Sequence, residues 1–217
     1  MNEDKPKLFR ILWFPVLFVS TICCIKLLEI SLHYSISRWG ILPQTIDGLK
    51  GILAAPLIHS DFEHVFSNSI PLLVLSSALF YFYNEIRFRV FFLIYFIHGI
   101  WLWSFGRESY HIGASGLVYG LAAFIFFSGV LRRNLNLMAL SLLTIFLYGS
   151  FVWGVLPYYL PEPNISWESH LSGAMAGIIL AWFYRTEGPQ RKVFEWEQND
   201  DNDDEIEFIE EEEEENK

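Results

Sequence analysis

Residues 109–131 read SYHIGASGLVYGLAAFIFFSGVL, and this stretch decides the fold class. It runs for 23 residues without an Asp, Glu, Lys or Arg. A helix that crosses a bilayer needs about 17–25 largely apolar residues, so the stretch is long enough to span a membrane. The helix of a soluble domain would keep a polar stripe towards water, and this stretch shows none. We therefore expect a transmembrane helix.

Uncharged runs of similar length occur on both sides of this stretch, at 64–84, 90–106, 134–161 and 169–184. A shorter run from Ile11 to Ile25 reaches spanning length if Lys26 and Glu29, three residues apart, pair or extend towards the lipid headgroups. The whole chain is 53% hydrophobic and only 18% charged, whereas soluble proteins average about 25% charged residues. The sequence predicts an all-α membrane protein with a bundle of six transmembrane helices.

These runs divide the chain into three parts. Residues 1–8 are predicted to be a cytoplasmic N-terminus, residues 9–185 the six-helix domain, and residues 186–217 an acidic, disordered cytoplasmic tail. The segment from Ser31 to Phe62 is only mildly polar, and a free loop would expose its apolar side chains, so we expect it to pack on the outer end of the bundle with short helices. The expected transmembrane helices are 9–30, 63–84, 88–106, 112–131, 135–156 and 167–185.

The charged residues orient the bundle and exclude other classes of protein. Of the 25 acidic residues, 14 lie between Glu195 and Glu215, so the net charge of −10 belongs to the tail, and no basic stripe suggests a nucleic-acid partner. The two cysteines, Cys23 and Cys24, are adjacent, which excludes a disulfide framework. The positive-inside rule places both termini in the cytoplasm, and we expect a multi-pass protein of the bacterial inner, or plasma, membrane. The basic residues on the cytoplasmic side would be Lys5, Lys7, Arg10, Arg87, Arg89, Arg132, Arg133, Arg185, Arg191 and Lys192, against Arg38, Lys50 and Arg107 on the other side.

Polar residues inside transmembrane helices are costly and usually functional, and three of the predicted helices carry them at one end. His64 and Asn68 lie at the start of the second helix, Ser115 at the start of the fourth and His170 at the start of the sixth. Even-numbered helices all begin on the same side of the membrane, so these side chains share one depth below the outer surface, where water can enter. Hydrolysis within a membrane requires a nucleophile, a base and N–H donors at one depth.

Glycines accompany both Ser115 and His170. Gly113 lets a tight loop feed the fourth helix, whose free N–H groups can stabilise an oxyanion. Pairs of glycines spaced four apart are typical of helices that approach closely, and if two such faces meet here, Ser115 and His170 come within hydrogen-bond reach. Taken alone, a serine in a membrane helix is more often a structural hydrogen-bond partner, and a histidine is more often a structural or ligand residue. The paired glycines are Gly116 and Gly120 in the fourth helix and Gly173 and Gly177 in the sixth.

A metal site is the competing interpretation of the polar residues before the second helix. His59 and His64, with Asp61 or Glu63, could be drawn as ligands. The sequence contains no H-E-x-x-H pattern, and spacing through a loop fixes no geometry. His64 and Asn68 are instead four residues apart on one helix face and can donate to one oxygen from the same side. We expect neither a metal nor another cofactor.

Taken together, these motifs resemble the rhomboid family of intramembrane serine proteases. The resemblance covers about residues 9–185, and the segment from Trp39 to His59 is also similar to the first loop of that family. The motifs that carry it are His64 with Asn68, Gly113 to Gly116 around Ser115, Tyr119, and His170 followed by Gly173 and Gly177.

The resemblance implies a Ser-His dyad without a third acid, with Ser115 as nucleophile and His170 as general base and later acid. This is consistent with our interpretation that the fourth and sixth helices contain no Asp or Glu. His64, Asn68 and the backbone N–H of Ser115 would form the oxyanion hole, and Tyr119 would pack against the His170 ring. The supporting glycines would be Gly113, Gly116, Gly173 and Gly177.

The implied substrates are single-pass membrane proteins, cut near the outer end of their transmembrane helix. A peptide bond inside a helix has to unwind before attack, and the loop from Pro157 to Trp167 with the fifth helix would be the gate. The alternative function is a catalytically silent member of the same fold that binds membrane helices. Silent relatives lack the Ser or the His, whereas Ser115 and His170 are both present. A transporter would call for intramembrane charges or paired broken helices, which the sequence does not show.

Overall fold

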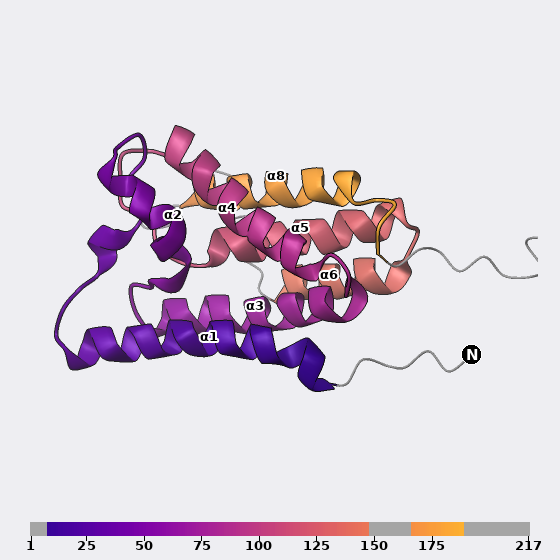
Figure 1. Ribbon diagram of the computed structural model, residues 1–217, viewed down its shortest axis with the longest axis horizontal. Coiled ribbons are helices and arrows are strands. Elements are labelled where there is room, and N and C mark those ends of the chain that lie inside the picture. The colour runs from indigo at the N-terminus through magenta and orange to yellow at the C-terminus, as the bar shows by residue number, and fades with distance from the viewer. Residues whose placement is uncertain (1–7, 148–165, 189–217) are drawn as a thin grey trace, which may run out of the picture.

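The computed structural model describes residues 8–147 and 166–188, and Figure 1 shows them as a bundle of helices. Four short helical segments lie between the first two long helices, and the described residues contain no strand. The protein is an all-α membrane bundle. The long helices are α1 (Leu8–Ser31), α3 (Phe62–Phe82), α4 (Arg87–Phe105), α5 (Ser115–Leu131), α6 (Leu135–Leu147) and α8 (Trp167–Phe183). The short segments are η1 (Ser37–Trp39), η2 (Asp47–Lys50), α2 (Gly51–Ala54) and η3 (Ala55–Leu57).

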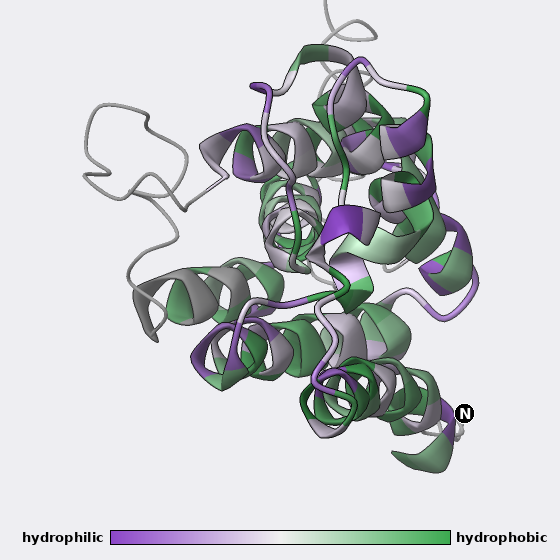
Figure 2. Cartoon of the chain, turned by 90° about the vertical axis from the view of Figure 1, so that its left-hand side faces the viewer, coloured by the Kyte–Doolittle hydropathy of each residue, from purple (hydrophilic) through white to green (hydrophobic). Residues whose placement is uncertain are grey.

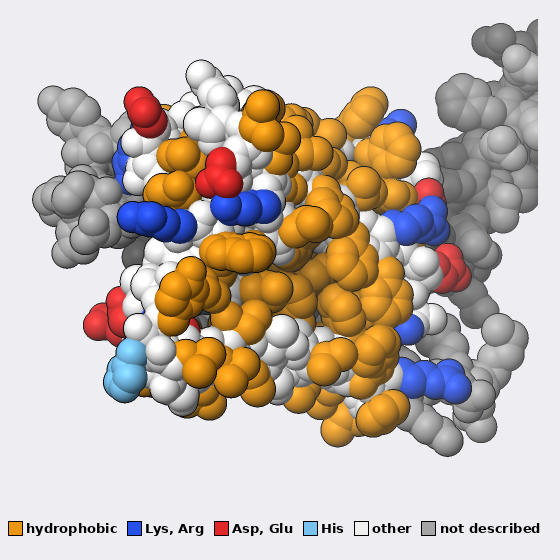
Figure 3. All heavy atoms as spheres, turned by 60° about the vertical axis from the view of Figure 1, so that its left-hand side comes forward, with side chains coloured by type: hydrophobic (Ala, Val, Ile, Leu, Met, Phe, Trp, Pro, Cys, Tyr) orange, Lys and Arg blue, Asp and Glu red, His pale blue; other side chains and the backbone are white. Residues whose placement is uncertain are grey.

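The surface of the bundle is apolar along its length. The helices α1, α3 and α4 are each long and apolar enough to cross a membrane, and α5 is a shorter apolar helix. Large apolar side chains such as Phe66, Ile100 and Trp182 are exposed. In Figure 3 hydrophobic side chains cover most of the visible face, whereas charged side chains lie mainly towards its two ends. Soluble proteins do not expose apolar surface on this scale, so the chain is an integral membrane protein.

Helix α5 is the central helix of the described bundle. It packs against α3, α4, α6 and α8, and its buried residues include Leu117, Val118, Leu121 and Phe124 on several sides of the helix. A helix that is apolar all round belongs in the middle of a bundle. Figure 1 shows that α3, α5 and α8 begin at the same end, on the left of the view. We call this the site end, because it holds the predicted polar residues.

The start of α5 differs from the sequence prediction. The helix was expected over 112–131, but it begins at Ser115. Gly113 has φ +106°, which is incompatible with a right-handed helix and which residues other than glycine rarely adopt. The residues before Ser115 therefore form a loop rather than a helical turn, and Ser115 is the first residue of the helix.

The segment between α1 and α3 packs on the site end, so the prediction of short helices packed on the bundle is confirmed. Tyr95 of α4 donates its hydroxyl to the Leu53 carbonyl oxygen (2.5 Å), and the Trp103 indole N–H donates to the Thr45 carbonyl oxygen (2.8 Å). Ile41 forms an isolated antiparallel bridge with His111 in the loop before α5. The segment is thereby tied both to α4 and to the chain that feeds Ser115.

Lys26 and Glu29 pair near the end of α1, as predicted, at 2.8 Å between Nζ and Oε2. The ammonium group also donates to the carbonyl oxygens of His59 (3.1 Å) and Ser60 (2.8 Å). Lys26 is buried, so its charge is compensated by one carboxylate and two carbonyl dipoles. This contact fixes the backbone just before α3 against α1.

The other end of the bundle is held by Arg132, the residue that follows α5. It is buried, and its guanidinium donates to Ser128 and to the carbonyl oxygens of Tyr184 and Glu187, both at 2.5 Å. The predicted tail boundary at residue 186 therefore differs from the structure. Residues up to Gly188 pack on the bundle, because Arg132 satisfies the carbonyls beyond the end of α8 and because Gly188 lies against the Tyr83 ring.

Several predictions fall outside the described residues. They concern residues 1–7, the later part of the helix expected over 135–156, most of the loop from Pro157 to Trp167, and the acidic tail from residue 189 onward.

Candidate active site

The N-terminus of α5 presents Ser115 in a half-buried position. The preceding loop is fixed by backbone hydrogen bonds, since Gly113 N–H donates to the Ala55 carbonyl oxygen (2.9 Å). The N–H groups of the first helical turn have no acceptor within the helix. They point out of the helix end, where they can bind an oxygen that carries negative charge. Figure 2 looks onto this end of the bundle and shows hydrophilic segments among the hydrophobic helices.

His170 lies in the first turn of α8 and is 8% exposed. Its ring stacks on the Tyr119 ring with centroids 4.1 Å apart and planes 8° apart. Tyr119 is four residues after Ser115, so both lie on one face of α5, one turn apart. The stacking therefore brings the His170 imidazole to the face of α5 that carries the serine.

The glycine faces of α5 and α8 meet. A Cβ atom on Gly173 would collide with the Gly116 carbonyl, and one on Gly177 would lie 2.8 Å from the Phe124 backbone nitrogen. A Cβ on Gly120 would lie 3.0 Å from the Gly173 carbonyl oxygen. The backbones of the two helices are thus in direct contact, as the spacing of the glycines predicted, and side chains could not be accommodated between them.

His64 stands at the start of α3, whose N-cap is Asp61. The Asp61 carboxylate accepts from the His64 backbone N–H at 2.8 Å, which caps the N-terminus of the helix and anchors its first turn. The imidazole lies against the loop before Ser115, because a Cβ on Gly113 would be 2.6 Å from His64 Nε2. A residue larger than glycine at 113 would displace this ring. The fold therefore brings His64 next to the nucleophile loop.

Asn68 lies one turn further along α3 and is 6% exposed. Its Nδ2 donates to the His64 carbonyl oxygen at 2.9 Å, and its buried Oδ1 has no partner within the described residues. An amide nitrogen carries two hydrogens, and Nδ2 also makes a longer contact of 3.4 Å with the hydroxyl oxygen of the exposed Ser67. The described contacts of Asn68 are thus with α3 itself.

His59 makes a contact that the sequence did not predict. The sequence analysis named His59 only as a possible ligand in the rival metal hypothesis. Its Nε2 accepts from the Ala114 backbone N–H at 3.3 Å, and its ring meets the His64 ring edge to face with centroids 4.8 Å apart. Burial, together with the nearby His64, lowers the pKa of His59 to about 3. His59 is therefore neutral at pH 7, as a hydrogen-bond acceptor has to be. Within the described residues no group of three or more His, Cys, Asp and Glu side chains could hold a metal ion.

The prediction that the sixth helix contains no acidic residue is wrong. Ser166 caps α8, so the helix begins at Trp167 and its first turn includes Glu168. This glutamate is 3% exposed, and its Oε1 lies 3.7 Å from Arg107 Nε. Glu168 and His170 are two residues apart, and residues at that spacing face different sides of a helix. The helical geometry therefore gives no support for Glu168 as a third member of the dyad.

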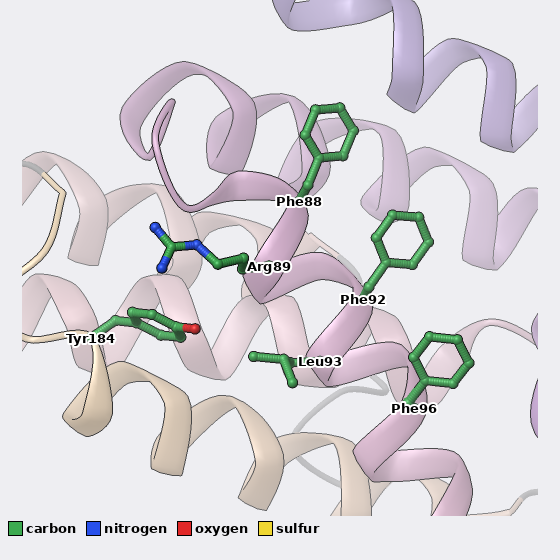
Figure 4. A pocket seen from close by; sticks show the side chains of 6 residues that line it. All are labelled: Phe88, Arg89, Phe92, Leu93, Phe96 and Tyr184. Carbon is green, nitrogen blue, oxygen red and sulfur yellow. The ribbon is translucent and has the colours of Figure 1, made fainter.

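One hollow of the described surface lies away from these residues. It has a volume of about 480 Å³ and sits where α4 begins and α8 ends, at the opposite end from Ser115. Figure 4 shows the aromatic side chains of α4 beside Arg89 and Tyr184. Its wall is almost entirely apolar, as expected of a lipid-facing surface. The lining residues are Phe88, Arg89, Phe92, Leu93, Phe96 and Tyr184.

The chain is similar in sequence to known proteins. A family model described as the rhomboid domain matches residues 47–187. One uncharacterized protein of Mycobacterium bovis and one of Mycobacterium tuberculosis are each 32% identical to this chain over 182 residues, which is 81% of this chain and 75% of the relative. An uncharacterized protein of Mycobacterium leprae is 31% identical over 184 residues, which is 81% of this chain and 71% of the relative.

Proposed function

Because the chain belongs to the rhomboid family of intramembrane proteases, we propose that it is an active serine endopeptidase that cleaves transmembrane helices of membrane proteins near their outer end. The observation that carries the proposal is the stacking of His170 on Tyr119 at 4.1 Å, one helical turn from Ser115. A general base has to lie within reach of the proton that it removes. The direct contact of the α5 and α8 backbones supports the same arrangement, since it leaves no room for side chains between the two helices.

In this proposal Ser115 and His170 perform the covalent chemistry. The Ser115 hydroxyl attacks the carbonyl carbon of the substrate peptide bond, and His170 accepts the hydroxyl proton. His170 then gives that proton to the leaving amine, which produces an ester between the substrate and Ser115. A water molecule, deprotonated by His170, hydrolyses the ester and restores both groups.

The oxyanion of the tetrahedral intermediate would be bound by N–H donors from two helices. The backbone N–H of Ser115 comes from the first turn of α5, and α3 supplies the His64 ring and an N–H of the Asn68 amide, turned from its longer contact with Ser67. Support comes from the position of the His64 ring against Gly113, two residues before the nucleophile. Donors fixed before the reaction stabilise the developing charge without reorganisation.

The proposed orientation has both termini in the cytoplasm of a bacterium and the site near the outer face of its inner membrane. Basic residues support it, because those described at the start of α1 and α4 and at the end of α5 and α8 share one end of the bundle (Figure 1). A reporter active only in the cytoplasm should work after Lys192 and fail at Pro163. The residues concerned are Arg10, Arg87, Arg89, Arg132, Arg133 and Arg185.

The decisive experiment compares purified wild type with Ser115→Ala in liposomes that contain a generic single-pass membrane substrate. Cleavage by the wild type alone supports the protease. Binding of the substrate helix without cleavage by either protein would favour a catalytically silent relative that recognises membrane helices.

A further inference from the structure

Two polar links join the loop before Ser115 to the first turn of α8. The first is the ion pair between Arg107 and the buried Glu168, at 3.7 Å from Nε to Oε1. The second is the contact of His111 Nδ1 with the Ser166 hydroxyl, at 2.7 Å. His111 lies four residues before Ser115, and Ser166 lies four residues before His170. Each link therefore connects the segment that carries one member of the dyad to the segment that carries the other.

The hydrogen-bond partners of His111 define its protonation. Its Nε2 lies 3.0 Å from the Arg107 carbonyl oxygen, which can only accept, so Nε2 carries the hydrogen and donates. In the neutral ring Nδ1 is then an acceptor, and the Ser166 hydroxyl donates to it. The same Ser166 oxygen accepts from the Ser169 backbone N–H at 3.3 Å and caps α8. One hydroxyl thus both starts the helix of His170 and attaches it to His111.

The environment of His111 keeps the ring neutral. Burial lowers its pKa, and so does the charge of Arg107, whereas the Arg107 carbonyl and the carboxylate of Glu168 raise it. His111 is also held by its backbone, which exchanges hydrogen bonds with Ile41 at 2.8 and 2.9 Å. The ring is therefore a fixed anchor rather than a mobile surface group.

The start of α8 is held by side chains rather than by backbone contact. Gly173 and Gly177 hold the α8 backbone against α5 below His170, and in the first turn the Ser169 hydroxyl lies against Gly116. The residues before Ser169 depend on side-chain contacts for their position. A displacement of about 1 Å at a reacting group can cost about 10²-fold in rate. Contacts that fix the start of α8 therefore bear directly on the distance between the two dyad members.

We propose that Arg107, His111, Ser166 and Glu168, here called the clamp, are positioning residues that hold His170 in its reactive position relative to Ser115. This inference rests on the proposed protease function. The clamp contacts the base through its backbone, since the His170 N–H donates to the Ser166 carbonyl oxygen at 3.3 Å, so it acts through the placement of α8. Loss of a clamp link should lower the rate of the chemical step and leave substrate binding intact.

The test uses variants that separate the link from the helix cap. His111→Phe removes the link but keeps Ser166 as the cap, Ser166→Ala removes both, and Ser166→Thr keeps a hydroxyl at the same place. Cleavage in liposomes should show kcat reduced about tenfold in His111→Phe and Ser166→Ala, with KM within about twofold of the wild type. Ser166→Thr should restore most of the rate. Ser104→Ala removes an exposed hydroxyl near the C-terminus of α4, at the site end of the bundle, and should have the kcat and KM of the wild type.

Two outcomes would overturn the proposal. One is a normal kcat in His111→Phe. The other is an equal loss of kcat in Ser166→Thr and Ser166→Ala, since a hydroxyl link should survive the conservative change. If the wild type itself fails to cleave, the protease proposal fails. The clamp is then tested separately, by amide hydrogen exchange at residues 169–173. Faster exchange in His111→Phe than in the wild type would support it, and equal exchange would exclude it.

Discussion

The carbonyl oxygen of Gly116 occupies the space in which a side chain on Gly173 would begin. Two helices that meet in this way are spaced by their backbones rather than by interdigitating side chains. Ser115 immediately precedes one of these glycines, and His170 lies three residues before the other. The spacing of the candidate dyad is therefore coupled to the closest backbone contact between α5 and α8.

Enlarging a glycine in this contact should damage stability and activity together. Gly120→Leu or Gly177→Leu forces side-chain atoms against backbone that cannot move away, and overpacking costs about 1–3 kcal/mol. We expect a lower unfolding temperature in detergent and a loss of cleavage of about 10²-fold or more. Ile179→Leu, on the exposed side of the same helix, is the control and should leave both quantities unchanged. Full stability in Gly177→Leu would mean that α8 does not depend on this contact.

Removing either member of the dyad should abolish cleavage without unfolding the protein. Ser115→Ala and His170→Ala should each reduce kcat to background, and the double variant should be no worse, because the two groups act as a unit. Ser77→Ala is the matched control, since the buried hydroxyl oxygen of this α3 serine has no hydrogen-bond partner within the described residues. Near-normal turnover in either dyad variant would refute the assignment.

Asn68 should affect the rate of cleavage strongly and the stability of the folded protein only slightly. Loss of one oxyanion donor typically costs about 10²–10³-fold in kcat, and that is the reduction expected for Asn68→Ala. The buried Oδ1 lacks a partner within the described residues, so removal of the amide also removes an unpaired polar atom, and the unfolding temperature should change little. Ile70→Val, on the exposed side of the same helix, should retain activity. An active Asn68→Ala would leave the amide with a structural role alone.

His59 should make the fold sensitive to acid. Its folded-state pKa of about 3 lies below the ordinary 6.5, so the unfolded chain binds a proton that the folded protein excludes. The stabilisation is complete above pH 6.5 and is lost as the pH falls from 6.5 towards 3, at about 1.4 kcal/mol for each unit of the shift. The groups that act on His59 besides burial are His64, Lys26, Asp61 and the Leu57 backbone.

The measurement is the unfolding temperature of wild type and His59→Gln between pH 7 and 4. The variant loses the hydrogen bond from Ala114 and should be less stable at pH 7. Because it lacks the titrating ring, it should lose less stability on acidification than the wild type does. Parallel curves for the two proteins would show that His59 is not responsible.

The periodic features of the chain were predictable from sequence, because they follow from helix geometry. Uncharged runs indicate where helices span a membrane, and glycines four residues apart lie on one face. The stacking of Tyr119 on His170 is present as the family resemblance implied. These features depend on residues close together in the sequence or on a motif shared with relatives.

Contacts made by loops were not predictable in the same way. Glu168 stands at the border of an uncharged run and inside the helix expected over 167–185, but its ion pair with Arg107, sixty-one positions earlier, had no sequence signal. Lys26 was expected to pair with Glu29, but its bonds to the carbonyls of His59 and Ser60 join residues more than thirty positions apart. Gly188 would be read as part of a tail, yet its φ of +89° and its contact with Tyr83 make it a fixed turn. No local pattern encodes these contacts.

The bonds of Arg132 have a consequence for the behaviour of the protein in different lipids. Arg132 attaches the last turn of α5 to the carbonyls that follow α8, and the glycines join the same two helices further along. A pair fastened at separate levels cannot slide lengthwise, so a thinner or thicker bilayer tilts both helices together. Ser115 and His170 then keep a common depth in the membrane. A change in acyl-chain length should therefore affect how a substrate enters the site and leave the relative position of these two residues unchanged.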